Sequence, residues 1–231
     1  MNHHGITTLS LALLAASTGA LAAEPTGGPR LDYFGRSSFR IVTSSGFVVY
    51  VDPYAPGDYS LPADLVLSSH GHGDHNQVGK VALKADATIV AAKDAVQGFS
   101  VETISEGEER SFGPVTVHAL PAANKNHPRG LGLGFLLSFD GIVLYYSGDT
   151  SRLPEMEGWK TYSINYALIC SDGFYNMGVT EAADSALAMG AKRIVPIHTS
   201  KNGMFDEAVA RSAKYSEVIV ARPGDSIALL K

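Results

Sequence analysis

Short apolar runs separated by turn residues recur along most of the chain. Each run is rich in Val, Ile and Phe and is bounded by Gly, Asp, Ser or Pro, which is typical of β-strands. In the first half they predict strands over 38–43, 47–51, 64–68, 87–92 and 115–120. In the second half they predict strands over 133–139, 142–147, 166–170, 193–198 and 217–221.

Two segments between these runs have helical patterns. Thr180 can cap a helix over 181–189, with Gly190 placed to end it. A second helix is predicted over 204–214, where apolar residues recur at the spacing of one helix face. Many short strands with a few helices predict an α/β layered domain whose sheets are partly antiparallel.

The first 23 residues differ from the rest because they contain no Lys, Arg, Asp or Glu. The apolar run over 6–16 is shorter than the roughly 20 residues that span a bilayer. It is followed by Ala20-Leu21-Ala22, which fits a signal-peptidase site. We therefore expect a signal peptide over 1–23, a linker over 24–30 and one domain over 31–231. Cleavage would release a periplasmic or secreted protein without stable membrane insertion, and an uncleaved anchor is the alternative.

Composition and charge narrow the class of protein. Hydrophobic residues make up 45% of the 231 residues and charged residues 18%, which excludes a disordered chain or a polytopic membrane protein. Lys and Arg number 18 against 23 Asp and Glu, so the net charge of −5 provides no basic footprint for nucleic acid. The single cysteine, Cys170, cannot form an intramolecular disulfide and reads as a small core residue.

The strongest chemical motif directly follows the apolar strand predicted over 64–68. Three imidazoles and a carboxylate fall within six residues, and glycines allow the backbone to turn so that the side chains can converge. Neutral imidazole and carboxylate are the ligands that zinc and similar first-row ions take. The motif therefore predicts a metal site built from His70, His72, Asp74 and His75.

Further ligands are needed to complete such a site, and three polar residues at strand ends offer them. Asp149 and His198 end apolar strands, and His127 lies in a loop after the strand predicted over 115–120. Loops at one edge of a sheet can bring distant segments together. His118 is the alternative to His127, but it lies inside its strand, where a histidine is more often packed or solvated.

This ordered set of ligands resembles the metallo-β-lactamase superfamily, a four-layer αββα sandwich with a dinuclear metal site between its two sheets. The stretches Phe34 to Phe39, Val51-Asp52-Pro53-Tyr54, Ser147 to Thr150 and Tyr175 to Ala183 are similar to one branch. That branch holds L-ascorbate-6-phosphate lactonase-like enzymes and related small bacterial hydrolases. The resemblance covers residues 31–231.

The resemblance implies a role for each ligand. The first metal would be bound by His70, His72 and His127, the second by Asp74, His75 and His198, and Asp149 would bridge the two. Two divalent ions are implied, with zinc as the first choice and manganese or iron as alternatives. They would share a hydroxide that attacks the substrate, and Asp74 would orient it. Asp52 is expected either to position a ligand or to be a simple turn residue before Pro53.

Asp149 also bears on the substrate, because dedicated β-lactamases of this superfamily usually have Cys or a non-ligating residue at the bridging position. We expect a hydrolase of an ester, lactone or phosphodiester instead. Arg129 and Lys201 flank His127 and His198 and could bind a small anionic substrate. An iron-dependent oxidoreductase on the same fold and a non-catalytic metal-binding module are the alternatives. The oligomeric state is left open.

Overall fold

Two mixed β-sheets face each other in the computed structural model, which describes Met1 and residues 27–231. Nearly all of the predicted signal peptide therefore lies outside the described residues. The seven strands of the first sheet are, in spatial order, β13 (Ser226–Ala228), β1 (Arg30–Gly35), β2 (Ser38–Val42), β3 (Val48–Val51), β4 (Ala63–Ser68), β5 (Leu83–Ala91) and β6 (Glu102–Thr103). The six strands of the second are β12 (Arg193–Ile197), β11 (Tyr166–Cys170), β10 (Ile142–Tyr146), β9 (Gly132–Phe139), β8 (Val115–Ala122) and β7 (Glu109–Phe112).

Each sheet changes from antiparallel to parallel pairing along its width. Strands β1 to β3 pair antiparallel, whereas β3 to β6 run parallel. In the second sheet β7 to β10 pair antiparallel, and β10 to β12 run parallel. The parallel strands β4, β10 and β12 each end in a loop that carries candidate ligands, so the topology itself places those loops at sheet edges.

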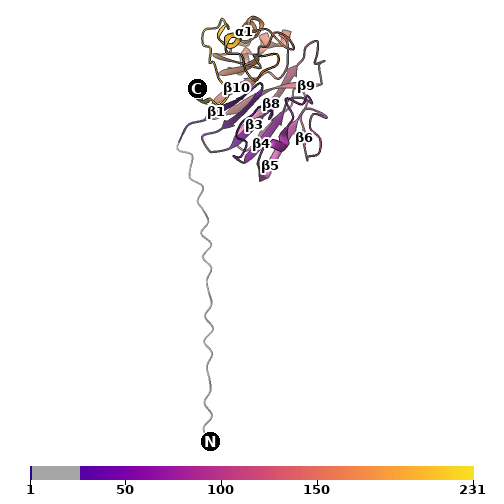
Figure 1. Cartoon of the computed structure of the whole chain (residues 1–231), viewed down its shortest axis with the longest axis vertical. Helices are drawn as coiled ribbons and strands as arrows, with labels where there is room; N and C mark the ends of the chain where they lie inside the picture. Colours follow the sequence, from indigo (N-terminus) through magenta and orange to yellow (C-terminus); the bar gives the residue numbers. More distant parts are fainter. Residues whose placement is uncertain (2–26) are drawn as a thin grey trace.

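Helices cover the outer faces unequally. On the second sheet, α1 (Val179–Ala188) and the 3₁₀ helix η2 (Pro154–Tyr162) pack over β11, and Figure 1 shows α1 on the outer side near β10. The first sheet is covered by the short 3₁₀ helix η1 (Val78–Lys80) and by loops. The predicted αββα fold is confirmed, with one thin outer layer. No helix in the described part of the chain is long and apolar enough to cross a membrane.

Alternation along the strands sorts apolar side chains into three layers. Leu65 and Leu67 of β4 point into the central layer between the sheets, whereas Val66 points to the outer face. In β10, Tyr146 faces the central layer and Tyr145 packs under η2 and α1. Each such fully buried side chain stabilises the fold by about 1.5–3 kcal/mol. The sheets are thus held face to face by a continuous apolar core.

Three predicted elements differ from the structure. Helix α1 begins at Val179 with Gly178 as its N-cap, two residues before the predicted cap, so Thr180 lies inside the first turn. The helix predicted over 204–214 is reduced to α2 (Glu207–Arg211), since Asp206 accepts a hydrogen bond from Val209 N and starts the helix there. The segment 217–221 forms a single bridge to Ile194 instead of a strand.

Gly148 allows the chain to reach Asp149 from the end of β10. Its φ is +57°, in the left-handed region that favours glycine. A Cβ at this position would contact the carbonyl oxygen of Leu133 in β9, which belongs to the same sheet. Glycine is therefore required here on two counts, because the backbone conformation and the close approach both exclude a side chain.

We expect Gly148→Ala to destabilise the fold by about 2–4 kcal/mol, because left-handed strain and a clash with backbone add together. Urea unfolding measures the change. Gly98→Ala is the matched control, since Gly98 also has a positive φ, of +80°, but nothing lies within 4 Å of its added Cβ. The control substitution should lower the free energy of unfolding by about 1 kcal/mol. Equal losses for the two variants would contradict the proposed clash.

Candidate metal centre

Seven candidate ligands meet where the two sheets adjoin. His70 to His75 follow β4 of the first sheet, whereas Asp149 and His198 follow β10 and β12 of the second. His127 comes from the loop between β8 and β9. Four segments that are far apart in the sequence therefore supply one cluster, as the ligand pattern predicted. The cluster is formed of His70, His72, Asp74, His75, His127, Asp149 and His198.

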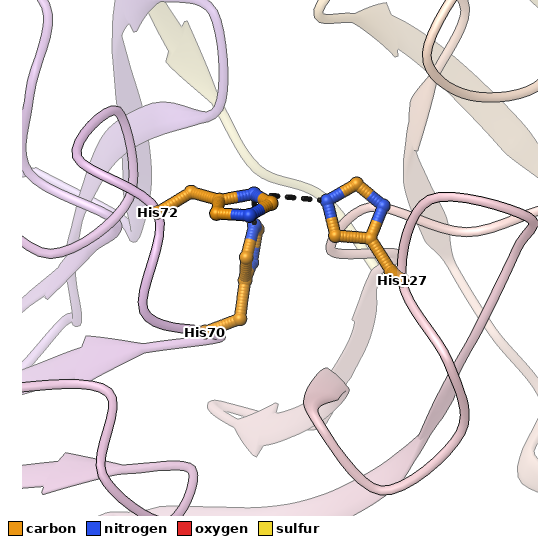
Figure 2. Close-up of side chains that lie close together, drawn as sticks. All are labelled: His70, His72 and His127. Atoms are coloured by element: carbon orange, nitrogen blue, oxygen red, sulfur yellow. Dashed lines mark hydrogen bonds between the residues drawn. The ribbon is translucent and has the colours of Figure 1, made fainter.

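The first group is formed by three imidazoles. His72 Nδ1 lies 3.2 Å from His70 Nε2 and 3.0 Å from His127 Nε2. Figure 2 shows the three rings turned toward one another from two loops. One nitrogen of each ring lies within 4.8 Å of the others, so one ion could contact all three. We call this group the first position.

The second group combines a carboxylate with two imidazoles. Asp74 Oδ1 lies 3.8 Å from His75 Nε2, and Asp74 Oδ2 lies 3.7 Å from His198 Nε2. These atoms also lie within 4.8 Å of one another. Both imidazoles are buried, while Asp74 is partly exposed and so faces the opening of the site. We call this group the second position.

Asp149 lies between the two positions. Its Oδ1 is 3.5 Å from His75 Nε2, and its Oδ2 is 3.7 Å from His127 Nε2. One carboxylate oxygen therefore faces each group, which is the arrangement a bridging ligand needs. The carboxyl group is 6% exposed, so its charge is not screened by bulk water.

The donor set fits a pair of first-row ions. Ligands about 2.1 Å from a tetrahedral ion lie about 3.4 Å apart, close to the separations measured here. His75 Nε2 and Asp149 Oδ1 are both buried, and neither has a hydrogen-bond partner among the described residues. Buried polar atoms are rarely left unpaired, and a bound ion would satisfy both.

Each of the four buried imidazoles has a polar partner behind it. In the first position, His70 Nδ1 lies 3.0 Å from Ser69 Oγ, and His127 Nδ1 lies 2.9 Å from Asn124 Oδ1. These two partners are neutral. Because each partner holds Nδ1 of its ring, the other nitrogen of His70 and of His127, Nε2, is turned toward the centre of the site.

The partners in the second position are carboxylates. His75 Nδ1 lies 2.6 Å from Asp52 Oδ2, and His198 Nδ1 lies 3.0 Å from Asp172 Oδ2. A carboxylate behind an imidazole fixes the ring and makes its free nitrogen a stronger ligand. The two positions therefore have similar ligands but differ in the charge behind them.

Asp52 is fully buried and accepts hydrogen bonds from several groups. Ser69 donates from its backbone N at 2.7 Å and from Oγ at 2.5 Å, His75 donates from Nδ1, and Tyr146 donates from its hydroxyl. Asp52 also lies within 4.8 Å of ligand nitrogens of His70 and His75, but its oxygens are already taken by these donors, so we interpret it as a residue that orients ligands. This agrees with the positioning role that the sequence left open.

The imidazoles of His70 and His127 in the first position are held neutral. Burial lowers the pKa of His70 to about 2, with a further contribution from the nearby charge of His75. Burial likewise lowers the pKa of His127. A neutral imidazole has a free lone pair, which is the state that binds a metal ion.

The second position instead favours positive charge. Burial alone would lower the pKa of His75, but Asp149 and Asp52 outweigh it and raise the pKa. Burial would also lower the pKa of His198, but the surrounding carboxylates, first of all Asp172, outweigh burial and raise that pKa to about 10. These carboxylates thus create a site in which an imidazole proton, or a metal ion in its place, is stabilised.

Three residues of the site have left-handed backbone conformations although none is glycine. Their φ angles are +44° for Asp52, +46° for His198 and +50° for Arg36. Such conformations cost about 1–3 kcal/mol each and persist where the surrounding structure fixes them. Here the chain turns sharply at the end of a strand, and the turn directs the side chain toward the cluster.

Two cavities open onto the cluster, and His72 lines both. One has a volume of about 330 Å³ and is lined by Arg36, His72, Asp74, Asp149, Tyr175, His198, Lys201 and Asn202. The other, of about 300 Å³, is lined by His70, Gly71, His72, Lys93, Asp94, Asn126, His127 and Leu131. The ligands are therefore accessible to a small molecule from two sides.

The two predicted anion-binding residues have different surroundings. Lys201 lines the first cavity, and its Nζ lies 3.5 Å from the centre of the Phe174 ring. Arg129 instead pairs with Glu106 and Glu155 and lines neither cavity. Its charge is already balanced by these carboxylates, so of the two residues only Lys201 lines a cavity beside the ligands.

Neither His118 nor Cys170 belongs to the ligand cluster. His118 Nδ1 lies 3.9 Å from Glu109, and its ring packs on the edge of Tyr162. This geometry favours His127 over His118 as the third imidazole. Cys170 is buried beside the carbonyl of Thr150, and burial, aided by the charge of Asp149, raises the pKa of its thiol to about 12. It is an inert core residue.

Sequence reasoning missed several residues that hold the ligands. Asp172 was not singled out, although it lies two residues after β11 at the same edge of the sheet as Asp149 and His198. The roles of Ser69 and Asn124 were also missed. A polar residue just past a strand end is the common signal, but it does not tell which imidazole the side chain will face.

The fold and this cluster define an αββα protein with a His- and Asp-rich site at the junction of its sheets. A family model described as a beta-lactamase superfamily domain matches residues 30–198. The chain belongs to the metallo-β-lactamase superfamily, as its ligand pattern predicted.

A relative in sequence and two solved structures are similar to this chain. A UPF0173 metal-dependent hydrolase of Methanoregula boonei is 31% identical over 202 residues, which cover 78% of this chain and 89% of the relative. Igni18, a metallo hydrolase of Ignicoccus hospitalis, has a similar fold, with a TM-score of 0.71 and 22% identity over 86% of this chain and 97% of its own. CmlA, a diiron β-hydroxylase of Streptomyces venezuelae, shares the fold at a TM-score of 0.64 and 14% identity, over 88% of this chain and 54% of CmlA.

We expect Asp52→Asn to weaken metal binding at the second position by about 10–100-fold, because an amide keeps the shape of the side chain but cannot accept from all its donors. Competition with a chelator measures the affinity. Asp140→Asn is the control, since Asp140 bonds only to Ser44 on the surface among the described residues. An unchanged affinity in Asp52→Asn would contradict the positioning role.

Proposed function

We propose that this protein is an exported dinuclear metal hydrolase that cleaves an ester, lactone or phosphodiester bond in a small anionic substrate. The broader class, a metal-dependent hydrolase of the metallo-β-lactamase superfamily, follows from its family and relatives. The observation that carries the finer proposal is the position of Asp149. One of its oxygens faces each group of imidazoles, as two adjacent cations require.

The seven ligands would be divided between two ions. His70, His72 and His127 would hold one ion, Asp74, His75 and His198 the other, and Asp149 both. When bound, the pair would supply an acidified water as nucleophile and a Lewis acid for the substrate oxygen. Zinc suits these donors best, and manganese and iron suit them as well.

Asp74 would orient the nucleophile and accept its proton. It is the partly exposed member of the second position and lines the first cavity, so it can face both the ions and the substrate. Burial would raise its pKa, but the nearby imidazoles of His198 and His75 hold that pKa below its usual range. The carboxylate is therefore ionised at neutral pH, as an acceptor of protons must be.

Lys201 would bind the anionic part of the substrate. Its ammonium group lies over the Phe174 ring beside the cavity that opens onto Asp74 and His198. A cation there complements a phosphate or carboxylate group. A small molecule fits a cavity of about 330 Å³, whereas the net charge of −5 argues against a nucleic acid partner.

A dedicated β-lactamase is disfavoured by the same geometry. Asp149 holds the position between the two groups, and Cys170 is buried behind it with a raised pKa. A thiolate ligand from Cys170 would require that core to rearrange. The lactonase-like branch remains our preferred comparison within the superfamily for the bond that is cleaved.

We expect Asp149→Asn to lower kcat on the best substrate by more than about a hundredfold. Loss of a residue that only supports a ligand costs up to about a hundredfold, and Asp149 is proposed to be a ligand itself. The assay is a panel of lactones, thioesters, phosphodiesters and lactams, run on protein of measured metal content. Asp184→Asn is the matched control, since Asp184 is an exposed carboxylate on α1.

Two results would contradict the hydrolase. Hydrolysis that survives both metal removal and Asp149→Asn would exclude the proposed centre. An iron chromophore together with oxygen consumption would favour an oxidoreductase, and tight metal binding without turnover on any of the panel would favour a binding module.

Export is the remaining part of the proposal. The apolar run over 6–16, followed by Ala20-Leu21-Ala22, supports it, although the first residues lack the Lys or Arg that is typical of a signal peptide. Expressed in a Gram-negative host, the full chain should be found in the periplasm, shortened by about 22 or 23 residues, when measured by intact mass. A chain beginning at Glu24 behind a new Met should stay in the cytoplasm. Full-length protein retained in the membrane fraction would instead indicate an anchor.

A further inference from the structure

Arg36 is fixed beside the second position by its own backbone. Its N–H donates to the carbonyl of Met204 at 2.7 Å, and its carbonyl accepts from His198 N at 3.0 Å and from the hydroxyl of Tyr33 at 2.8 Å. Arg36 and the ligand His198 are thus joined through main-chain atoms. None of these bonds depends on the side chain of residue 36, so they would survive its substitution.

The guanidinium group of Arg36 reaches the atoms that would bind the second ion. Nη1 lies 3.2 Å from His198 Nε2 and 3.9 Å from Asp74 Oδ2. The side chain is 12% exposed and lines the same cavity as these two ligands. A fixed positive charge therefore lies next to the place where a second positive charge is expected.

The one ion pair recorded for this charge among the described residues is the long contact with Asp74. Its other contacts are the carbonyl of Ser200 at 3.5 Å from Nη1 and that of Lys201 at 3.4 Å from Nη2, both long. The Nε nitrogen is buried without a partner. The nearest carboxylate oxygen recorded for the group is that of Asp74, a proposed metal ligand, so Arg36 and the ion would share one counter-charge.

The first position has no such neighbour. Among the described residues, His70, His72 and His127 make no hydrogen bond or ion pair with a lysine or arginine. The carboxylates of Asp52 and Asp172 support the second position alone. Arg36 thus offsets part of an excess of negative charge found only on that side.

We propose that Arg36 competes electrostatically with the second metal ion and keeps it weakly bound and exchangeable. The inference rests on the proposed dinuclear centre and adds a residue that tunes it. Two cations within a few ångströms repel each other strongly where water is excluded. Removing the arginine charge should therefore strengthen binding at the second position and leave the first unchanged.

Zinc titration of the purified, metal-free protein against a competing chelator tests this, with bound metal counted by mass spectrometry. Arg36→Gln should bind the second ion at least about tenfold more tightly than the unsubstituted protein, while the first affinity stays within about twofold. Arg36→Met is a second neutral variant, and Arg36→Lys keeps the charge and should remain near the unsubstituted value. Thermal unfolding checks that each variant is folded.

Lys201→Gln is the matched control, because it removes a cation from the same cavity that lies over Phe174 and not on a ligand atom. The affinity of this variant for the second zinc ion should change by less than about threefold. A shift as large as that of Arg36→Gln would show a general charge effect and overturn the proposal.

The remaining outcomes separate this inference from the proposed function. Two ions bound with unchanged affinities in Arg36→Gln and Arg36→Met would overturn the role of Arg36 but leave the dinuclear hydrolase standing. A single ion bound by every variant, even at excess zinc, would overturn both. Weaker binding of the second ion in the neutral variants would also reject competition, since Arg36 would then support the site.

Discussion

The buried carboxylate of Asp52 is the interaction on which the site depends. It follows β3 of the first sheet and accepts hydrogen bonds from Ser69 and His75 after β4, and from Tyr146 of β10 in the second sheet. A buried charge is stable only when its oxygens are satisfied in this way. Asp52 thereby fixes the ligand loop to both sheets, and a ligand position in one sheet is set relative to the other.

The rest of the site is a set of strand ends directed at this anchor. Parallel strands of one sheet end at a common edge, which brings together the loops after β10 and β12. The loop after β4 of the first sheet meets them there, although up to about 130 residues separate these loops in the sequence. Rigid sheets then hold the side chains, with left-handed turns at Asp52 and His198 aiming them inward. The strain of these turns is outweighed by the packed core beneath them.

Charge distinguishes two positions that look alike by ligand type. Neutral partners stand behind the imidazoles of the first, whereas carboxylates stand behind those of the second. Arg36 adds a cation to the second position only. Two ions bound as we propose would lie in different surroundings, one among three imidazoles and the other among opposite charges, on the side where the more exposed Asp74 lines the cavity.

The sequence by itself determined the α/β class and the ligand types. Apolar runs such as β4 are strands in any context that buries them, and imidazoles and a carboxylate within six residues remain close in any fold. Local signals were weaker where packing decides: the helix over 204–214 was shortened at Asp206, and 217–221 made one bridge to Ile194. Tertiary structure alone decided that Asp172 supports His198, that Arg129 is neutralised by glutamates and that Arg36 faces the second position. These contacts join residues 23 to 162 positions apart, and their geometry is set by how strands pair, which no local pattern encodes.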